Sequence, residues 1–278
     1  MSTISAAAVM ALRNRTNAPM MDCKAALTEA KGDMEKAAEI LRKQNKAIQD
    51  KKADRETAEG RIAAFISAED KVGALLEMRC ESAPVAKTKD FVQLADDIAK
   101  QVALKNPKSV DELLAQPYVG DPKHTVNDHI ADVFGVIREK MRPARFTRLT
   151  GLLGSYCHHD GRVGAMVQVE GDKADPQMLK EICMHITFKD PVAAQRADVP
   201  AETIEKEKDI ARAQAAATGK PANIVEKIAE GKLKTWLAEH VLVEQPFIRD
   251  ETKTVGDLLK SAGLKLVRFV RYQIGQLT

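Results

Sequence analysis

The sequence predicts an α+β protein built from a three-helix unit, two sheet-and-helix subdomains and a helical hairpin. Apolar residues make up 44% of the 278 residues but aromatic residues only 4%, which favours Ala-rich helices and thin sheets over an aromatic β-sandwich. Charged helical patterns at 202–217 and 222–239 flank a Thr-Gly-Lys-Pro stop signal, which predicts an antiparallel hairpin. Alternating apolar residues predict strands at 62–66 and 72–80, with a turn at Asp70-Lys71, and a second hairpin is predicted from strands at 145–156 and 162–169.

Three short helices are predicted within residues 5–45. Ser5 is a suitable N-cap for the first helix, and Gly32 ends the second, which starts near Pro19. Asp33 caps the third. The residues expected on the inner faces are Val9, Leu12, Ala37, Ile40 and Leu41. Because so small a unit buries little apolar surface, it is expected to be marginal alone.

A polar segment, 44–60, is predicted to be a partly helical linker. Its basic residues Lys51, Lys52 and Arg55 are interpreted as a solvated run. The first domain is therefore predicted to span residues 1–54.

Two related subdomains are predicted after the linker. The segment 163–169, Val-Gly-Ala-Met-Val-Gln-Val, resembles 72–78, Val-Gly-Ala-Leu-Leu-Glu-Met. A chance similarity between short apolar strands is the alternative, but strand, turn and helix recur in the same order, which favours a repeat. The predicted subdomains are 55–143 and, together, 144–201 and 241–278, with the hairpin of 202–240 inserted in the second.

Corresponding helices carry similar apolar faces in the two subdomains. These faces are Ala95, Ile98 and Val102 in the first and Leu179, Ile182 and Ile186 in the second. His185 lies one residue from the second face and is expected to be partly exposed. The hairpin has a thin apolar stripe of Ile204, Ile210, Ile224, Ile228, Leu233 and Leu237. Such a hairpin is expected to be a contact arm, toward a partner or between two copies of the chain.

The residues offer no pattern typical of catalysis. The four cysteines, Cys23, Cys80, Cys157 and Cys183, form no Cys-x-x-Cys pair. The run from Cys157 to Asp160 holds ligand-type atoms, but neighbouring strand residues point to opposite faces and cannot easily converge on one metal ion. No Gly-rich phosphate loop is present. We expect no metal, no cofactor and no covalent chemistry, with a Cys157-based hydrolase as the alternative that thiol labelling would test.

Charge and hydropathy limit the kinds of partner that the chain can bind. The 43 basic and 40 acidic residues give a net charge of +3, which argues against an extended nucleic-acid footprint. No apolar run approaches the roughly 20 residues that span a bilayer. Scattered cysteines and the lack of a signal pattern favour a soluble, cytoplasmic protein that binds neither nucleic acid nor membrane.

The most specific motif lies at residues 12–27, Leu-Arg-Asn-Arg-Thr-Asn-Ala-Pro-Met-Met-Asp-Cys-Lys-Ala-Ala-Leu. Asn17 there can adopt a left-handed conformation with little strain. The motif closely resembles the opening of bacterial elongation factor Ts. Further segments similar to that family are Cys80–Lys87, Gly154–His158, Met184-His185, Gly219-Lys220-Pro221, Gln245–Phe247 and Lys253–Leu259. The resemblance covers essentially the whole chain, in order.

This resemblance implies a translation elongation factor that promotes nucleotide exchange and catalyses no covalent chemistry. Its implied partner is elongation factor Tu, both GDP-bound and nucleotide-free. The N-terminal unit would be a UBA-like three-helix domain that docks on the partner's G domain, and the hairpin a coiled coil. The implied contact residues are Arg13, Thr16, Met20, Met21, Asp22, Lys24 and His158.

The family's loop after the first β-hairpin disturbs the partner's magnesium site, and this chain departs from the family there. The corresponding residues are Ser82, Ala83, Pro84 and Val85. Ala83 replaces an aspartate and Pro84 replaces the intruding phenylalanine. Because proline stiffens a loop, we expect 82–85 to act by backbone shape. The alternative function is a helical adaptor whose N-terminal bundle binds another protein.

Overall fold

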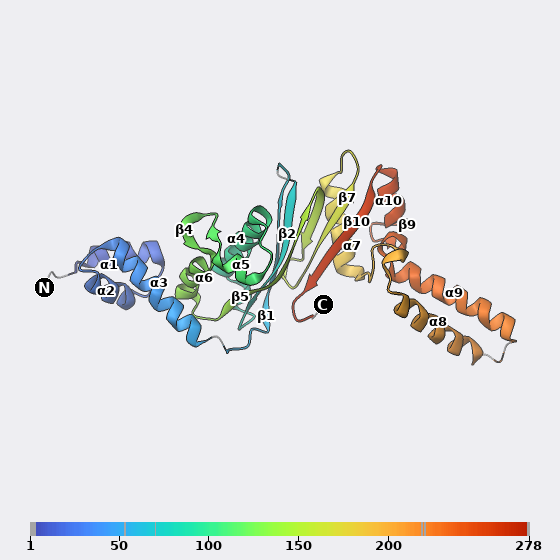
Figure 1. Ribbon diagram of the computed structural model, residues 1–278, viewed down its shortest axis with the longest axis horizontal. Helices are drawn as coiled ribbons and strands as arrows, with labels where there is room; N and C mark the ends of the chain where they lie inside the picture. The colour runs from blue at the N-terminus through green and yellow to red at the C-terminus, as the bar shows by residue number, and fades with distance from the viewer. Residues whose placement is uncertain (1–3, 53, 70, 218, 220, 277–278) are drawn as a thin grey trace.

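The chain folds into an elongated molecule with mixed helices and antiparallel sheets, as predicted (Figure 1). The computed structural model describes residues 4–52, 54–69, 71–217, 219 and 221–276. Asp70 of the predicted turn and Thr218 and Lys220 of the predicted hairpin tip lie outside these residues. The N-terminal helices occupy one end, the two three-stranded sheets the middle, and the helical hairpin the other end.

The N-terminal unit consists of α1 (Ala6–Thr16), α2 (Met20–Glu29) and the first part of α3 (Met34–Lys51). The Ser5 hydroxyl accepts the Ala8 N–H at 3.1 Å, and the Asp33 carboxylate accepts the N–H groups of Glu35 and Lys36, so both predicted caps are confirmed. The buried core contains Val9, Leu12, Cys23, Ala26, Leu27, Ala37 and Leu41.

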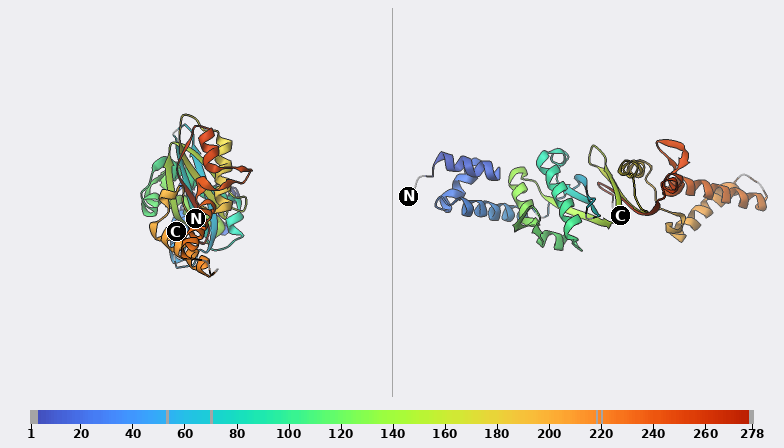
Figure 2. Two further views of the ribbon diagram at one scale, coloured as in Figure 1. Left: turned by 90° about the vertical axis from the view of Figure 1, so that its right-hand side faces the viewer. Right: turned by 90° about the horizontal axis from the view of Figure 1, so that it is seen from above.

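Helix α3 continues without a break to Lys51, so residues 44–51 are not a linker. Its second half packs on α6 (Val126–Ile137), as the second view of Figure 2 makes visible. Gly135 of α6 permits this approach, since a Cβ atom there would lie 2.3 Å from Asn45 Nδ2. The Arg42 guanidinium also forms two hydrogen bonds of 2.9 Å with the Asp132 carboxylate. The helix therefore connects the N-terminal unit rigidly to the core.

The basic run at the end of α3 is solvated only in part. Lys51 and Arg55 are exposed, as predicted, although Arg55 Nη1 lies 3.0 Å from the Glu81 carboxylate. Lys52 is half-buried, and its Nζ donates to the Arg138 carbonyl at 2.5 Å, so the interpretation was wrong for Lys52. The sequence could not indicate this contact because Arg138 is distant along the chain.

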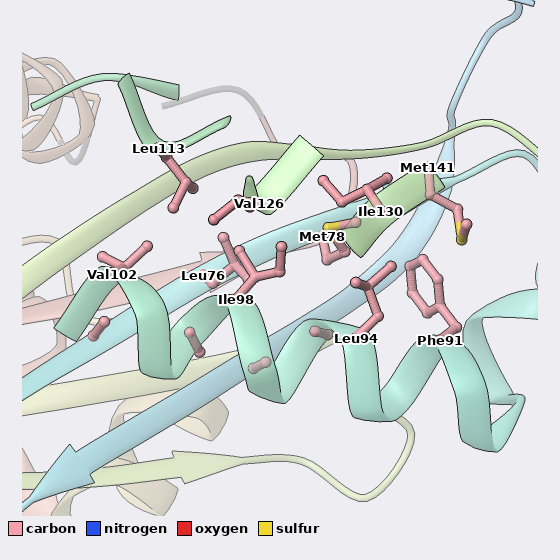
Figure 3. Packing of buried hydrophobic residues seen from close by; sticks show 14 of the residues in the cluster. Leu76, Met78, Phe91, Leu94, Ile98, Val102, Leu113, Val126, Ile130 and Met141 are labelled. Atoms are coloured by element: carbon pink, nitrogen blue, oxygen red, sulfur yellow. The ribbon is translucent and has the colours of Figure 1, made fainter. Parts of the chain in front are cut away.

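The first sheet has the order β1-β2-β5, with β1 (Glu59–Ser67), β2 (Val72–Cys80) and β5 (Met141–Thr150) antiparallel. Helices α4 (Lys89–Lys105) and α6 cover one face, and the short α5 (Val110–Ala115) packs beside them. Figure 3 shows Phe91, Leu94, Ile98 and Val102 of α4 against Leu76 and Met78 of β2. The predicted apolar face of this helix is buried.

The second sheet has the order β10-β7-β6, formed by β6 (Leu152–Cys157), β7 (Val163–Glu170) and β10 (Lys265–Gln273). Helix α7 (Pro176–Lys189) covers its outer face with the predicted residues Leu179, Ile182 and Ile186. The inner faces of the two sheets meet through Ile62, Leu75, Leu149, Met166, Tyr272 and Ile274. The core is thus layered helix, sheet, sheet, helix.

The predicted strand 145–156 is in fact two strands in different sheets. Gly151, with φ of +100°, separates β5 from β6. Because β5 pairs with β2 along its length, the first sheet extends to Thr150, and the predicted subdomain boundary at 143/144 falls inside β5. No turn signal other than Gly151 marks this change of sheet in the sequence.

A small hairpin and capped helix occurs twice. The strands β3 (Pro117–Tyr118) and β4 (Asp121–Thr125) precede α6, and β8 (Pro246–Phe247) and β9 (Asp250–Thr254) precede α10 (Val255–Ser261). The carbonyls of Gln116 and Gln245 accept the N–H groups of Val126 and Val255, each at 3.0 Å. Both helices begin with a Thr–Asp capping box. Sequence analysis missed this repeat, although Gln-Pro-aromatic and Thr-Val-x-Asp occur in both copies.

The hairpin at the far end pairs α8 (Ala201–Ala216) with α9 (Ala222–His240), close to the predicted bounds. Short 3₁₀ helices at Arg196–Asp198 and Leu242–Glu244 flank it. The buried residues of the two helices are Ala211, Ala215, Ala229 and Leu237. Of the predicted apolar stripe, Leu237 is buried, whereas Ile210 and Ile224 are 41% and 40% exposed and lie on the surface of the arm. Among the described residues, no helix has the length and hydropathy to cross a membrane.

Candidate partner-binding site

The α1–α2 turn is fixed by local hydrogen bonds. Asn17 is left-handed with φ of 52°, as predicted, and donates its N–H to the Arg13 carbonyl at 2.7 Å. Thr16 Oγ1 donates to the Leu12 carbonyl at 2.8 Å, and the buried Cys23 thiol donates to the Ala18 carbonyl at 3.6 Å. Thr16 therefore shapes the turn, and its half-buried side chain offers a partner little surface.

The outer face of α2 exposes apolar and basic side chains together. Met20 is 46% exposed and Met21 73% exposed, which is unusual for large apolar residues. Arg13 and Lys24 are also exposed. Met21 and Lys24 line a shallow depression with Ala25, Thr28 and Glu29. This face has the character of a protein-binding surface, because flexible Met side chains adapt to a partner.

Asp22 is half-buried and binds a residue of the core. Its Oδ2 atom lies 2.6 Å from Arg138 Nη2, at the C-terminal end of α6. The side chains are 42% and 34% exposed, so this ion pair is only partly screened by water. The pair attaches the predicted docking helix directly to the core.

The loop 82–85 leaves the end of β2 and enters the 3₁₀ helix η1 (Val85–Lys87). The Ser82 N–H and hydroxyl both donate to the Glu139 carboxylate, at 3.1 and 2.7 Å. Ala83 and Pro84 are exposed, whereas Val85 is half-buried against the core of the first sheet. The surface that this loop offers a partner is therefore the Ala83-Pro84 backbone, and Val85 holds it in place.

Glu81 anchors the base of the loop. Its carboxylate accepts the Lys140 N–H at 2.6 Å and pairs with Arg55. Burial alone would raise the pKa of Glu81, but the Lys140 hydrogen bond and the Arg55 guanidinium outweigh it and leave that pKa below its usual value. The carboxylate is thus held in its charged form beside the loop.

His158 lies in the β6–β7 turn, where its Nδ1 atom is 3.1 Å from the Tyr156 hydroxyl. The same turn reaches the edge of the first sheet, because the Gly161 carbonyl accepts the Ile62 N–H at 2.7 Å. The neighbouring Arg61 donates to the Ala86 carbonyl in η1 at 3.5 Å. The structure thus brings the His158 turn and the 82–85 loop to the same edge of β1. His158 also lines a surface groove with Tyr156, Val163, Met184, Thr187, Phe188 and Ile248.

The geometry opposes a Cys–His hydrolase. Burial raises the pKa of Cys157 to about 12, which keeps the thiol protonated at neutral pH. The neighbouring His158 is bonded to Tyr156 rather than to this thiol. Within the described part of the chain, no three His, Cys, Asp or Glu residues form a group suited to a metal ion.

His185 is buried, so its predicted partial exposure was wrong. Its Nε2 atom lies 2.9 Å from Gln245 Oε1, and its Nδ1 accepts the Ile248 N–H at 3.3 Å. These partners come from the second Gln-Pro hairpin, which no local sequence pattern near His185 could indicate. The side chain therefore joins α7 to β8.

The chain is similar to known proteins along nearly its whole length. The family model described as Elongation factor TS matches residues 81–276. Elongation factor Ts of Methylococcus capsulatus is 44% identical over 277 residues, covering 99% of this chain and 93% of that protein. The same factor from Thioalkalivibrio sulfidiphilus is 43% identical with equal coverage, and that of Clostridium perfringens is 40% identical over 98% of this chain and 93% of the relative. The chain therefore belongs to the elongation factor Ts family.

Proposed function

We propose that this protein is a translation elongation factor that binds elongation factor Tu carrying GDP and promotes release of the nucleotide. Family membership over nearly the full length of the chain carries this proposal. The activity would take place in the cytoplasm, where polypeptide chains are elongated.

In this proposal the exposed face of α2 docks on the partner through Met20, Met21 and Lys24, with Arg13 beside them. The Ala83-Pro84 surface and His158 contact the partner near its nucleotide site. Displacing a magnesium ion there would remove a large attraction for the diphosphate. No bond is made or broken, so the protein acts through binding free energy alone.

Thermodynamic linkage states what such a factor must do. If it binds the nucleotide-free partner more tightly than the GDP-bound partner, it must weaken GDP binding by the same factor. The experiment loads elongation factor Tu with fluorescent GDP, adds this protein, and follows dissociation. The proposal is supported if this protein accelerates GDP release and GDP in turn weakens the binding of this protein to elongation factor Tu. An unchanged release rate would favour the adaptor.

The rigid shape of the loop gives a specific prediction. Replacing both Pro84 and Val85 by glycine removes the fixed φ of Pro84 and the apolar anchor of Val85. We expect the maximal release rate to fall about tenfold, since small displacements of an acting group have large effects on rate. The measurement is the release rate at saturating concentration of the variant.

Pro122→Gly provides the matched control. Pro122 is also an exposed proline, but it lies in the β3–β4 hairpin outside the proposed contact surface. With the Pro122→Gly variant, elongation factor Tu should release GDP at the wild-type rate. A double glycine variant as active as wild type would contradict the assigned role of the loop.

A further inference from the structure

The connector between α6 and β5 is three residues long, and its residues contact both the N-terminal unit and the 82–85 loop. Arg138 pairs with Asp22 in the docking helix α2. Glu139 accepts both hydrogen bonds from Ser82 in the loop. Lys140 donates its N–H to Glu81 and its Nζ to the Arg55 carbonyl, at 2.6 and 2.8 Å. The two proposed partner contacts are thus attached to consecutive residues.

The backbone of Arg138 is unusual for its residue type. It follows the last turn of α6 in the left-handed region, with φ of 62°, and donates its N–H to the Phe134 carbonyl at 2.8 Å. Glycine is the residue best suited to this conformation, and other residues adopt it at a cost of about 1 kcal/mol. An arginine therefore gives up stability here, and what it adds over glycine is a side chain that reaches Asp22. Strain retained in this way often marks a functional position.

Other contacts hold the connector itself in place. The Arg138 carbonyl accepts Lys52 Nζ at 2.5 Å, just beyond the end of α3. The Lys52 ammonium also lies 5.3 Å from the centre of the Phe134 ring. Because both ends of the connector are anchored, the guanidinium of Arg138 defines a fixed distance between α2 and the loop.

We propose that Arg138 is a positioning residue that holds the docking helix α2 in register with the 82–85 loop, so that binding at α2 is used to drive the loop into the partner. This inference rests on the proposed function. With the ion pair intact, a partner that binds α2 meets the loop in a fixed position. Without it, α3 alone holds the N-terminal unit on the core, and a smaller share of the binding free energy at α2 lowers the barrier to release.

The test is Arg138→Gly, which removes the guanidinium while keeping a residue that favours the left-handed backbone. The release of fluorescent GDP is measured against factor concentration. We expect the maximal rate to fall about twofold to fivefold, because a partly exposed ion pair contributes a free energy of this size. The half-saturating concentration should stay unchanged. Arg138→Lys, which restores a cation, should recover part of the lost rate. Arg138→Asn, a second residue tolerant of this conformation, should behave like the glycine variant.

Arg196→Gln is the matched control, because it breaks a comparable Arg–carboxylate pair with Glu244 at the opposite end of the molecule. It should leave both kinetic parameters unchanged. An unchanged maximal rate in Arg138→Gly, or a change only in the half-saturating concentration, would overturn the inference. If the wild-type protein itself fails to accelerate release, the proposed function fails instead, so the two failures are distinguishable.

Discussion

Glu77 is a buried carboxylate held between two guanidinium groups. Its Oε1 atom lies 2.6 Å from Arg79 Nε, and its Oε2 atom lies 2.6 Å from Arg145 Nε. The Glu77 side chain is 1% exposed. Arg145 also stacks on the Tyr272 ring, with 4.3 Å between the guanidinium carbon and the ring centre. One carboxylate therefore joins the middle strand of the first sheet to the C-terminal strand of the second.

Replacing Glu77 by alanine should leave two partly buried cations without their partner. We expect the free energy of unfolding to fall by about 3 kcal/mol, as for other broken buried pairs. Urea denaturation of Glu77→Ala measures it. Glu35→Ala breaks an equally short but exposed pair with Arg15 and serves as the control that should not change stability measurably. If the two substitutions lowered the free energy of unfolding equally, burial would not determine the strength of these ion pairs.

His185 should make the stability of the protein depend on pH. Burial lowers its pKa, and the Lys189 charge lowers it further, against the opposing hydrogen bond with Gln245. Between this lowered value and the unfolded value of about 6.5, the unfolded chain binds more protons than the folded chain, so stability falls as the pH decreases through this window. Thermal unfolding at a series of pH values from about 7.5 to 5 would show this loss.

His185→Gln is the variant that isolates this contribution. It removes the titrating group, so it should be less stable than wild type at neutral pH but lose less stability on acidification. A wild-type slope retained in the variant would assign the pH dependence to other groups.

Among the elements, helix α3 depends on one close approach. Gly135→Ala should force the buried Asn45 side chain, whose Nδ2 atom would lie 2.3 Å from the added Cβ, into another rotamer. We expect this displacement to cost about 1–2 kcal/mol and to outweigh the gain in helix propensity. Gly231→Ala in α9 is the opposite case, since no atom lies within 4 Å of the added Cβ. It should stabilise the helix by about 0.5–1 kcal/mol.

Thermal or denaturant unfolding of the two alanine variants measures both effects. The signs are expected to differ although the substitution is the same. A stabilising Gly135→Ala would mean that α3 does not need this contact.

The elements were predictable where the pattern was local. The caps at Ser5 and Asp33 and the buried faces of α4 and α7 follow from spacing alone. The segment 44–60 was predicted to be partly helical, but its packing on α6 could not be predicted, because the contact joins residues distant along the chain. The change of sheet at Gly151 was equally hidden, since one continuous segment supplies strands to both sheets.

At the scale of the molecule, the resemblance predicts partner contacts at residues 13–24, 82–85 and 158, and these contacts stay predictions. The structure shows that Met20, Met21, Ala83 and Pro84 are exposed. What sequence could not supply is the set of links between them. The pairs Asp22–Arg138 and Ser82–Glu139 join residues distant along the chain. Hydrophobic periodicity in the sequence cannot indicate such pairs.

The layer between the two sheets has a consequence for synthesis. Tyr272 and Ile274 belong to that layer, and Thr147 Oγ1 lies 2.7 Å from the Tyr272 hydroxyl. In a chain emerging from the ribosome, β6 and β7 can cover part of the inner face of the first sheet, but the part that Tyr272 and Ile274 cover stays open to water until β10 has been made. The last strand, which pairs with β7, therefore closes an apolar surface that would otherwise favour aggregation.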